Sequence, residues 1–189
     1  MDFWMQLDQN LIDVNLLLWI QEHFRRDWMT PIWKFITSLG DAGWFWIVLA
    51  IGLLIVKKTR KTGVTACSSL LIGALITNVF LKNLVARTRP YEVISSLTLL
   101  VDPQHDFSFP SGHSCASFAV AMVLYKMLPR KYGIPAVVLA ALIAFSRLYV
   151  GVHYPSDVAA GILIGIFSAW AAGKIIDFMW EKREKKNEM

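Results

Sequence analysis

Charged residues and cysteines are both scarce in this chain of 189 residues. Charged residues make up 17% of the sequence and hydrophobic residues 56%, a balance that excludes an ordinary soluble domain. The two cysteines, Cys67 and Cys115, lack the close spacing of zinc ligands and fall near opposite ends of neighbouring apolar segments. The sequence therefore predicts neither a zinc site nor a disulfide, and the bilayer is the expected solvent.

Basic residues are distributed in a way that is typical of membrane topology. The formal net charge is +5, but the lysines and arginines gather in short loops between apolar segments and do not line one face. No nucleic acid partner is expected. The first residues carry Asp2, Asp8 and Asp13 and no basic cluster, so a cleaved signal peptide is not expected either.

Five apolar segments come close to the roughly 20 residues that a membrane-spanning helix requires. They cover residues 39–56, 64–86, 114–128, 134–150 and 158–179, of which the third is the shortest. The sequence thus predicts an all-α integral membrane protein, a helical bundle of about five transmembrane helices. Basic clusters within residues 57–61, 130–131 and 182–186 fall on one side of this topology, which is cytoplasmic by the positive-inside rule.

The amino-terminal segment is expected to lie on the membrane. Residues 3–24 place apolar side chains at helical spacing, with acidic and amide side chains between them. This pattern favours an interfacial helix over a sixth span, although it leaves both open. We accordingly divide the chain into an interfacial helical segment (1–38), a transmembrane domain (39–180) and a charged cytoplasmic tail (181–189).

Four basic residues break the topology rule, because they fall at or just beyond the outward ends of the spans, namely Lys82, Arg87, Arg89 and Arg147. Arg87 could join the other three or pair with Asp106. Ionisable groups at this depth are costly and mark a functional site by default. Snorkelling to the interface explains one such residue, whereas a convergent set needs an anionic partner. Nearby carboxylates could supply it, namely those of Glu92, Asp102, Asp106 and Asp157. A bound phosphate explains the convergence better.

Two histidines are expected on the same outward face, each at the start of a span. His113 directly follows Ser111 and Gly112, and His153 lies four residues before Asp157. Exposed backbone N–H groups and the helix dipole attract anions at helix starts. Ser111 could cap its helix, donate to a phosphate oxygen, or do both.

These residues form three motifs in chain order. Lys82 to Pro90 reads K-x6-R-P, Pro110 to His113 reads P-S-G-H, and Ser146 to Asp157 reads S-R-x5-H-x3-D. The set strongly resembles the three-part signature of the type 2 phosphatidic acid phosphatase superfamily, which also includes glucose-6-phosphatase and the vanadium haloperoxidases. Any one motif would be weak support, but all three are complete and share one face.

The resemblance implies a role for each motif residue. His153 is expected to attack phosphorus and form a phosphohistidine, with Asp157 holding its ring and His113 protonating the leaving oxygen. The expected phosphate-binding residues are Lys82, Arg89, Ser111, Gly112 and Arg147. No metal and no cofactor are expected. The basic side chains supply the positive charge that neutralises the phosphate, and no cluster of carboxylates stands at these positions to bind Mg²⁺.

The resemblance further implies a membrane phosphatase that acts on a lipid phosphate or diphosphate, with polyprenyl diphosphates such as undecaprenyl diphosphate as the favoured substrates. Phosphatidylglycerophosphate and phosphatidic acid are the alternatives, as are phosphotransfer to another lipid and a non-catalytic lipid-binding protein. The expected partners are the lipid substrate and the bilayer. The compact chain suggests a bacterial plasma membrane with an extracytoplasmic site. Oligomeric state cannot be read from the sequence.

The predicted orientation can be tested with single cysteines placed in a background that lacks Cys67 and Cys115. A cysteine at Ser96, in the outward loop, should react with a membrane-impermeant thiol reagent in intact cells, and one at Thr59 should react only after lysis. Labelling is read by the mass shift of the purified protein. The reverse pattern would overturn the topology.

Overall fold

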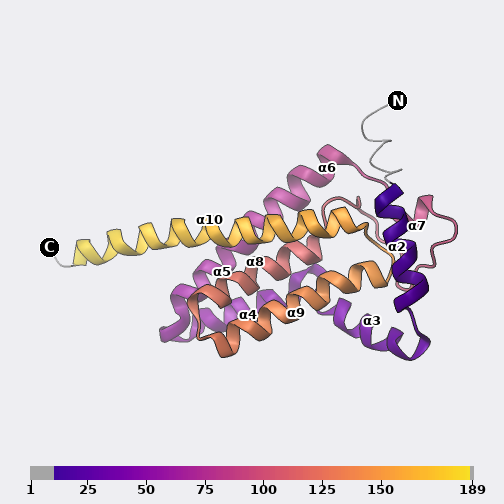
Figure 1. Ribbon diagram of the computed structural model, residues 1–189. Helices are drawn as coiled ribbons and strands as arrows, with labels where there is room; N and C mark the ends of the chain where they lie inside the picture. Colours follow the sequence, from indigo (N-terminus) through magenta and orange to yellow (C-terminus); the bar gives the residue numbers. More distant parts are fainter. Residues whose placement is uncertain (1–10, 188–189) are drawn as a thin grey trace.

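A computed structural model describes residues 11–187, which fold into a bundle of helices with shorter helices packed across one end (Figure 1). The bundle consists of α4 (Trp44–Ile55), α5 (Arg60–Ala74), α8 (Gly112–Met127), α9 (Arg130–Tyr149) and α10 (Pro155–Asn187). Each predicted span corresponds to one of these helices, so the predicted all-α bundle is confirmed. After α5 the chain continues through the π-helical segment η4 (Leu75–Leu81) into α6 (Lys82–Val85).

Among residues 11–187, three helices are long and apolar enough to cross a membrane, within Lys57–Val93, Arg130–Tyr149 and Pro155–Lys185. The pair Asp27–Ser38 and Asp41–Ile55, bent by 43°, is a fourth candidate. The remaining bundle helix, α8, has 16 residues and measures about 24 Å at the α-helical rise, less than the roughly 30 Å of a bilayer core. It packs against α5, α9 and α10 and buries most of its residues, so it is a central helix enclosed by its neighbours.

The enclosed position of α8 explains the serines in its apolar sequence. Ser114 and Ser117 are completely buried, and each has a partner, as buried hydroxyl groups require. The Ser117 hydroxyl accepts a hydrogen bond of 2.9 Å from the Trp46 indole of α4. The backbone oxygen of Ala119 likewise accepts one of 2.9 Å from Ser69 of α5. These bonds fix α8 against α4 and α5.

Small residues allow α8 and α10 to approach closely. A Cβ added at Gly161 would lie 2.5 Å from the Ser111 carbonyl oxygen, and one at Gly165 would lie 2.6 Å from the Cys115 carbonyl oxygen. Both neighbours are backbone atoms, which cannot swing aside. Close packing at glycine is the usual way in which helices associate where lipid removes the hydrophobic driving force. The contact matters for function because α8 and α10 begin with the two histidine motifs.

The amino-terminal helices α2 (Leu11–Phe24) and α3 (Thr30–Ser38), joined through the 3-10 turn η1 (Asp27–Met29), cover the end of the bundle at which α10 begins (Figure 1). On α2, Leu17 and Ile20 are buried. Leu11 and Ile12 are more than 70% exposed. This amphipathic arrangement agrees with an interfacial helix, which stays a prediction, and residues 3–10 of the predicted segment lie outside the described residues.

Three further segments connect the helices and bring distant parts of the chain to the same end. The turns are η2 (Asp41–Gly43), between α3 and α4, and η3 (Lys57–Thr59), between α4 and α5. The long loop between α6 and α8 contains the short helix α7 (Pro90–Val93). The backbone of this loop is held in place where the N–H of Leu100 donates a hydrogen bond of 3.1 Å to the carbonyl oxygen of Val150.

The close approach of α8 and α10 makes a stability prediction with an internal control. Gly165→Ala should destabilise the protein by about 1–3 kcal/mol, because its methyl group meets backbone that must shift. Gly52→Ala, on α4, meets nothing within 4 Å and should be neutral or stabilise by up to about 1 kcal/mol through helix propensity. The measurement is the midpoint of thermal unfolding in detergent. Equal midpoints would show that the α8–α10 contact is loose.

Candidate active site

A cavity of about 310 Å³ lies at the end of the bundle where α8 and α10 begin. Six of the eight predicted site residues line it, namely Lys82, Arg89, Gly112, His113, Arg147 and His153. The other two, Ser111 and Asp157, are fully buried and contact residues of the wall. The structure thus gathers the predicted residues from three separate motifs into one site.

Backbone irregularities aim the first motif at the cavity. The π-helical segment η4 immediately precedes Lys82, and such widened turns are common at functional sites because they redirect the residues that follow. At the other end of α6, Ala86 adopts a left-handed conformation with φ of 48°, which costs about 1 kcal/mol for a residue with a side chain. The chain turns there, and Arg87 and Arg89 point into the protein, each at most 3% exposed.

Asp106 neutralises two of the cavity's cations. Its carboxylate contacts the Lys82 ammonium group and accepts a hydrogen bond of 2.5 Å from Arg89. Burial alone would raise the pKa of Asp106, but its bonds to Lys82 and Arg89 outweigh this effect and lower it to about 2. The Asp106 side chain is 54% exposed, so it can move away when another anion competes for the two cations.

Arg147 supplies the third cation from the end of α9. The side chain is buried, and one of its terminal nitrogens donates 2.6 Å to the Thr37 hydroxyl of α3. Its Nε has no hydrogen-bond partner among the described residues. A buried guanidinium with unused donors is suited to bind an anion in the cavity that it lines.

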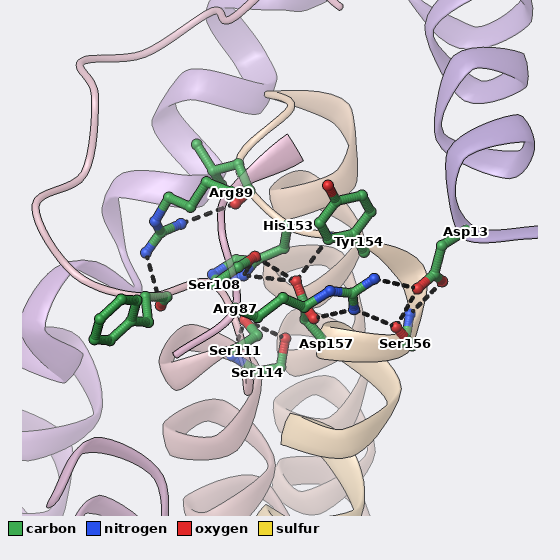
Figure 2. A network of polar contacts seen from close by, with 12 residues as sticks. Asp13, Arg87, Arg89, Ser108, Ser111, Ser114, His153, Tyr154, Ser156 and Asp157 are labelled. Carbon is green, nitrogen blue, oxygen red and sulfur yellow. Dashed lines mark hydrogen bonds and ion pairs between the residues drawn. The ribbon is translucent and has the colours of Figure 1, made fainter. Parts of the chain in front are cut away.

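His153 is held by two groups on one edge of its ring (Figure 2). Its Nδ1 lies 3.5 Å from Oδ2 of Asp157 and 3.4 Å from the Ser108 hydroxyl. The same Asp157 oxygen accepts hydrogen bonds of 2.5 Å from Ser108 and 2.9 Å from the backbone N–H of Tyr154. Because Ser108 donates its own proton to Asp157, this arrangement assigns the ring proton to Nδ1 and leaves Nε2 unprotonated.

Burial lowers the pKa of His153 to about 3, assisted by the charges of Arg89 and Arg147, although Asp157 opposes the shift. The imidazole is therefore neutral at neutral pH. A neutral ring is the form that can attack phosphorus, because its Nε2 lone pair is available.

The second histidine, His113, contacts a carboxylate that the motifs do not include. Its Nε2 lies 2.9 Å from the Asp41 carboxylate, and Asp41 belongs to the turn η2 between α3 and α4. Such a partner favours the protonated form of an imidazole, but burial and the charge of Arg147 outweigh it and lower the pKa of His113 to about 4. Just before His113, the Ser111 hydroxyl accepts a hydrogen bond from the Ser114 backbone N–H. Of the two roles predicted for Ser111, the structure shows the helix cap.

The sequence allowed Arg87 either to join the cation cluster or to pair with Asp106. In the structure it has other partners. It donates a hydrogen bond of 2.7 Å to Oδ1 of Asp157 and another of 2.9 Å to Oδ2 of Asp13 on α2. Its guanidinium carbon also lies 3.8 Å from the centre of the Tyr154 ring. Asp106 pairs with Lys82 and Arg89 instead, so the suggested Arg87–Asp106 pair is wrong.

Sequence reasoning missed three residues of the site, Asp13, Asp41 and Ser108. A signal existed only for Asp13, since it shares one helical face with Leu17 and Ile20 and is therefore expected to be buried. Ser108 and Asp41 stand in irregular segments, where no periodicity predicts the direction of a side chain. Within residues 11–187, no group of three or more His, Cys, Asp or Glu side chains is placed to hold a metal ion.

Comparison with known proteins matches the part of the chain that contains the predicted site residues. The model of the PAP2 superfamily matches residues 62–180. The undecaprenyl-diphosphatase of Sulfolobus acidocaldarius is 36% identical over 130 residues, which cover 69% of this chain and 63% of that protein, slightly under two thirds of its length.

Two crystal structures share the fold. That of Aquifex aeolicus LpxE has a TM-score of 0.78 and 28% identity, covering 86% of this chain and 95% of that one. That of a transmembrane PAP2 type phosphatidylglycerolphosphate phosphatase from Bacillus subtilis has a TM-score of 0.72 and 26% identity, covering 93% and 92%.

The position of Asp106 predicts that an anion entering the cavity must compete with this carboxylate for Lys82 and Arg89. Asp106→Asn should bind inorganic phosphate or vanadate about 3- to 10-fold more tightly than the wild type, because the anion no longer competes with a carboxylate. The gain is modest since solvent screens a half-exposed charge. Isothermal titration calorimetry measures it, with Asp102→Asn in the same loop as control. Weaker binding by Asp106→Asn would show that Asp106 supports the anion site.

Proposed function

This chain belongs to the PAP2 superfamily, and we propose that it is a metal-independent phosphatase that removes the terminal phosphate of a membrane lipid. The observation that carries the proposal is the placement of His153, backed by Asp157, in one cavity with His113 and three cations. Each group has a place in phosphoryl transfer, and several helices with the length and composition to cross a membrane agree with a multi-pass membrane protein.

In the first step, Nε2 of His153 attacks phosphorus while the bond to the leaving oxygen breaks. The ring retains its Nδ1 proton and becomes cationic, and the Asp157 carboxylate stabilises that charge. Lys82, Arg89 and Arg147 hold the phosphoryl oxygens, on which negative charge is spread in the transition state. The substrate phosphate displaces Asp106 from the first two of these cations.

His113 completes the reaction from the opposite side of the phosphoryl group. It gives its proton to the leaving oxygen and then accepts one from the water that attacks the phosphohistidine. Asp41 and the anionic substrate phosphate both favour the protonated form of His113 that donates this proton. Hydrolysis releases inorganic phosphate and restores a neutral His153.

The walls of the cavity support a lipid substrate. Beside the polar groups, the lining includes Ile47 on α4 together with Leu70 and Ala74 on α5, and Ile47 is 42% exposed. An apolar chain can therefore lie along these helices while its phosphate reaches His153. We favour a polyprenyl diphosphate, as the name of the Sulfolobus relative indicates, with phosphatidylglycerophosphate as the alternative, and a site on the outer face of a bacterial plasma membrane.

Phosphate release tests the proposal. The purified chain in detergent, with excess chelator, is given polyprenyl diphosphate, polyprenyl phosphate, phosphatidylglycerophosphate and phosphatidic acid. We expect turnover of at least one substrate and the highest kcat/KM for the diphosphate. Turnover of none, or turnover that requires added Mg²⁺, would reject the proposed mechanism.

The two histidines should respond differently to the leaving group. A lipid monoester expels a strongly basic alkoxide, and a diphosphate expels a far less basic phosphate monoester, so the first depends more on an acid. His113→Ala should lower kcat/KM for polyprenyl phosphate by about 10²- to 10⁴-fold and for the diphosphate by clearly less. His153→Ala should remove turnover of both. Equal losses for His113→Ala on the two substrates would exclude it as the leaving-group acid.

A further inference from the structure

Arg87 lies between two buried carboxylates behind the nucleophile (Figure 2). The side chains of Arg87, Asp13 and Asp157 are 1%, 6% and 0% exposed. One terminal nitrogen of Arg87 donates to Asp157 and the other to Asp13, so a single guanidinium bridges residues from α2 and α10. Buried charges require such pairing, because leaving one without its partner typically costs several kcal/mol.

Asp13 also contacts the start of α10 directly. Its Oδ1 accepts a hydrogen bond of 3.0 Å from the Ser156 backbone N–H, and its Oδ2 accepts one from the Ser156 hydroxyl. Free N–H groups at a helix start attract a negative charge. Asp13 therefore caps the helix that carries Asp157, although it comes from a helix more than 140 residues earlier in the chain. It also lies outside residues 62–180, which the family model matches.

The charges of this cluster bear on the reaction. Forming the phosphohistidine makes the His153 ring cationic, and Asp157 stabilises that cation by its negative charge. Arg87 is bound to Asp157 and by itself would cancel the carboxylate. Asp13 adds a second carboxylate, so Asp13, Arg87 and Asp157 together retain a single net negative charge beside His153.

We propose that Asp13 is a positioning residue of the active site, which orients Arg87 and the start of α10 and offsets the charge of Arg87 on Asp157. The inference rests on the proposed function of His153 and extends it to the amino-terminal helix. In Figure 2, Asp13 is separated from His153 by Arg87 and Asp157, so it acts through them and does not bind the substrate.

The test compares Asp13→Asn, which removes the charge, with Asp13→Glu, which keeps it. Asp13→Asn should lower kcat on polyprenyl diphosphate by about 10- to 100-fold, the usual loss when a residue that holds a reactive group is replaced. KM should change less than about twofold, because the phosphate-binding residues are untouched. Asp13→Glu should recover most of the loss. Leu17→Ala, which removes a fully buried side chain from the same helix, should lower the unfolding midpoint but leave kcat unchanged below it.

A double variant separates charge from packing. Asp13→Asn leaves the cluster without net charge, whereas Asp13→Asn with Arg87→Gln restores a single net negative charge on Asp157. The double variant should therefore have a higher kcat than Asp13→Asn, a non-additive result that a purely structural role does not produce. All rates are taken at a temperature at which each variant is folded by its unfolding curve.

Three results would overturn the inference: Asp13→Asn with wild-type kcat, equal losses for Asp13→Asn and Asp13→Glu, or a fall in kcat with Leu17→Ala as large as that with Asp13→Asn. Each requires an active wild type in the same assay. A wild type that releases no phosphate from any lipid of the panel instead rejects the proposed function, and the inference falls with it.

Discussion

Ion pairing between buried groups, centred on Arg87 and its carboxylates Asp13 and Asp157, is the interaction on which the rest of the site depends. An apolar bundle offers little solvation to a charge, so each buried cation and anion needs a partner of opposite sign. The cluster meets this need and joins three parts of the chain, since α2, the turn after α6 and the start of α10 each supply one member. The same contacts hold Asp157 against His153.

Two other cations of the site are held by a looser ion pair, because their shared carboxylate is open to solvent. Lys82 and Arg89 share Asp106, whose side chain is half exposed and stands in a loop. A buried pair persists because separation is costly, whereas a screened pair exchanges readily with another anion. The site thus combines a permanent cluster behind His153 with an exchangeable carboxylate in front of it, an arrangement that suits the proposed binding and release of a phosphate.

Backbone packing brings these charges within reach of each other. Glycines of α10 contact the backbone of α8, so the helices that begin with the two histidine motifs run close together. The left-handed turn at Ala86 then directs Arg87 and Arg89 inward. Both features therefore help to set the distance between His153 and His113 across the cavity, on which the proposed phosphoryl transfer to His153 depends.

The sequence by itself determined that the chain forms a bundle of membrane helices and which residues of the three motifs line the cavity. Hydropathy predicted each bundle helix, because solvation by lipid acts on every residue of a span separately. Motif spacing identified the residues that line the cavity, among them Lys82, Arg147 and His153. Only the tertiary structure decided which carboxylate pairs with which cation, and whether α8 spans or fills the bundle. Asp13 and Ser156 lie 143 residues apart, and no local pattern encodes such a contact because it depends on how whole helices pack.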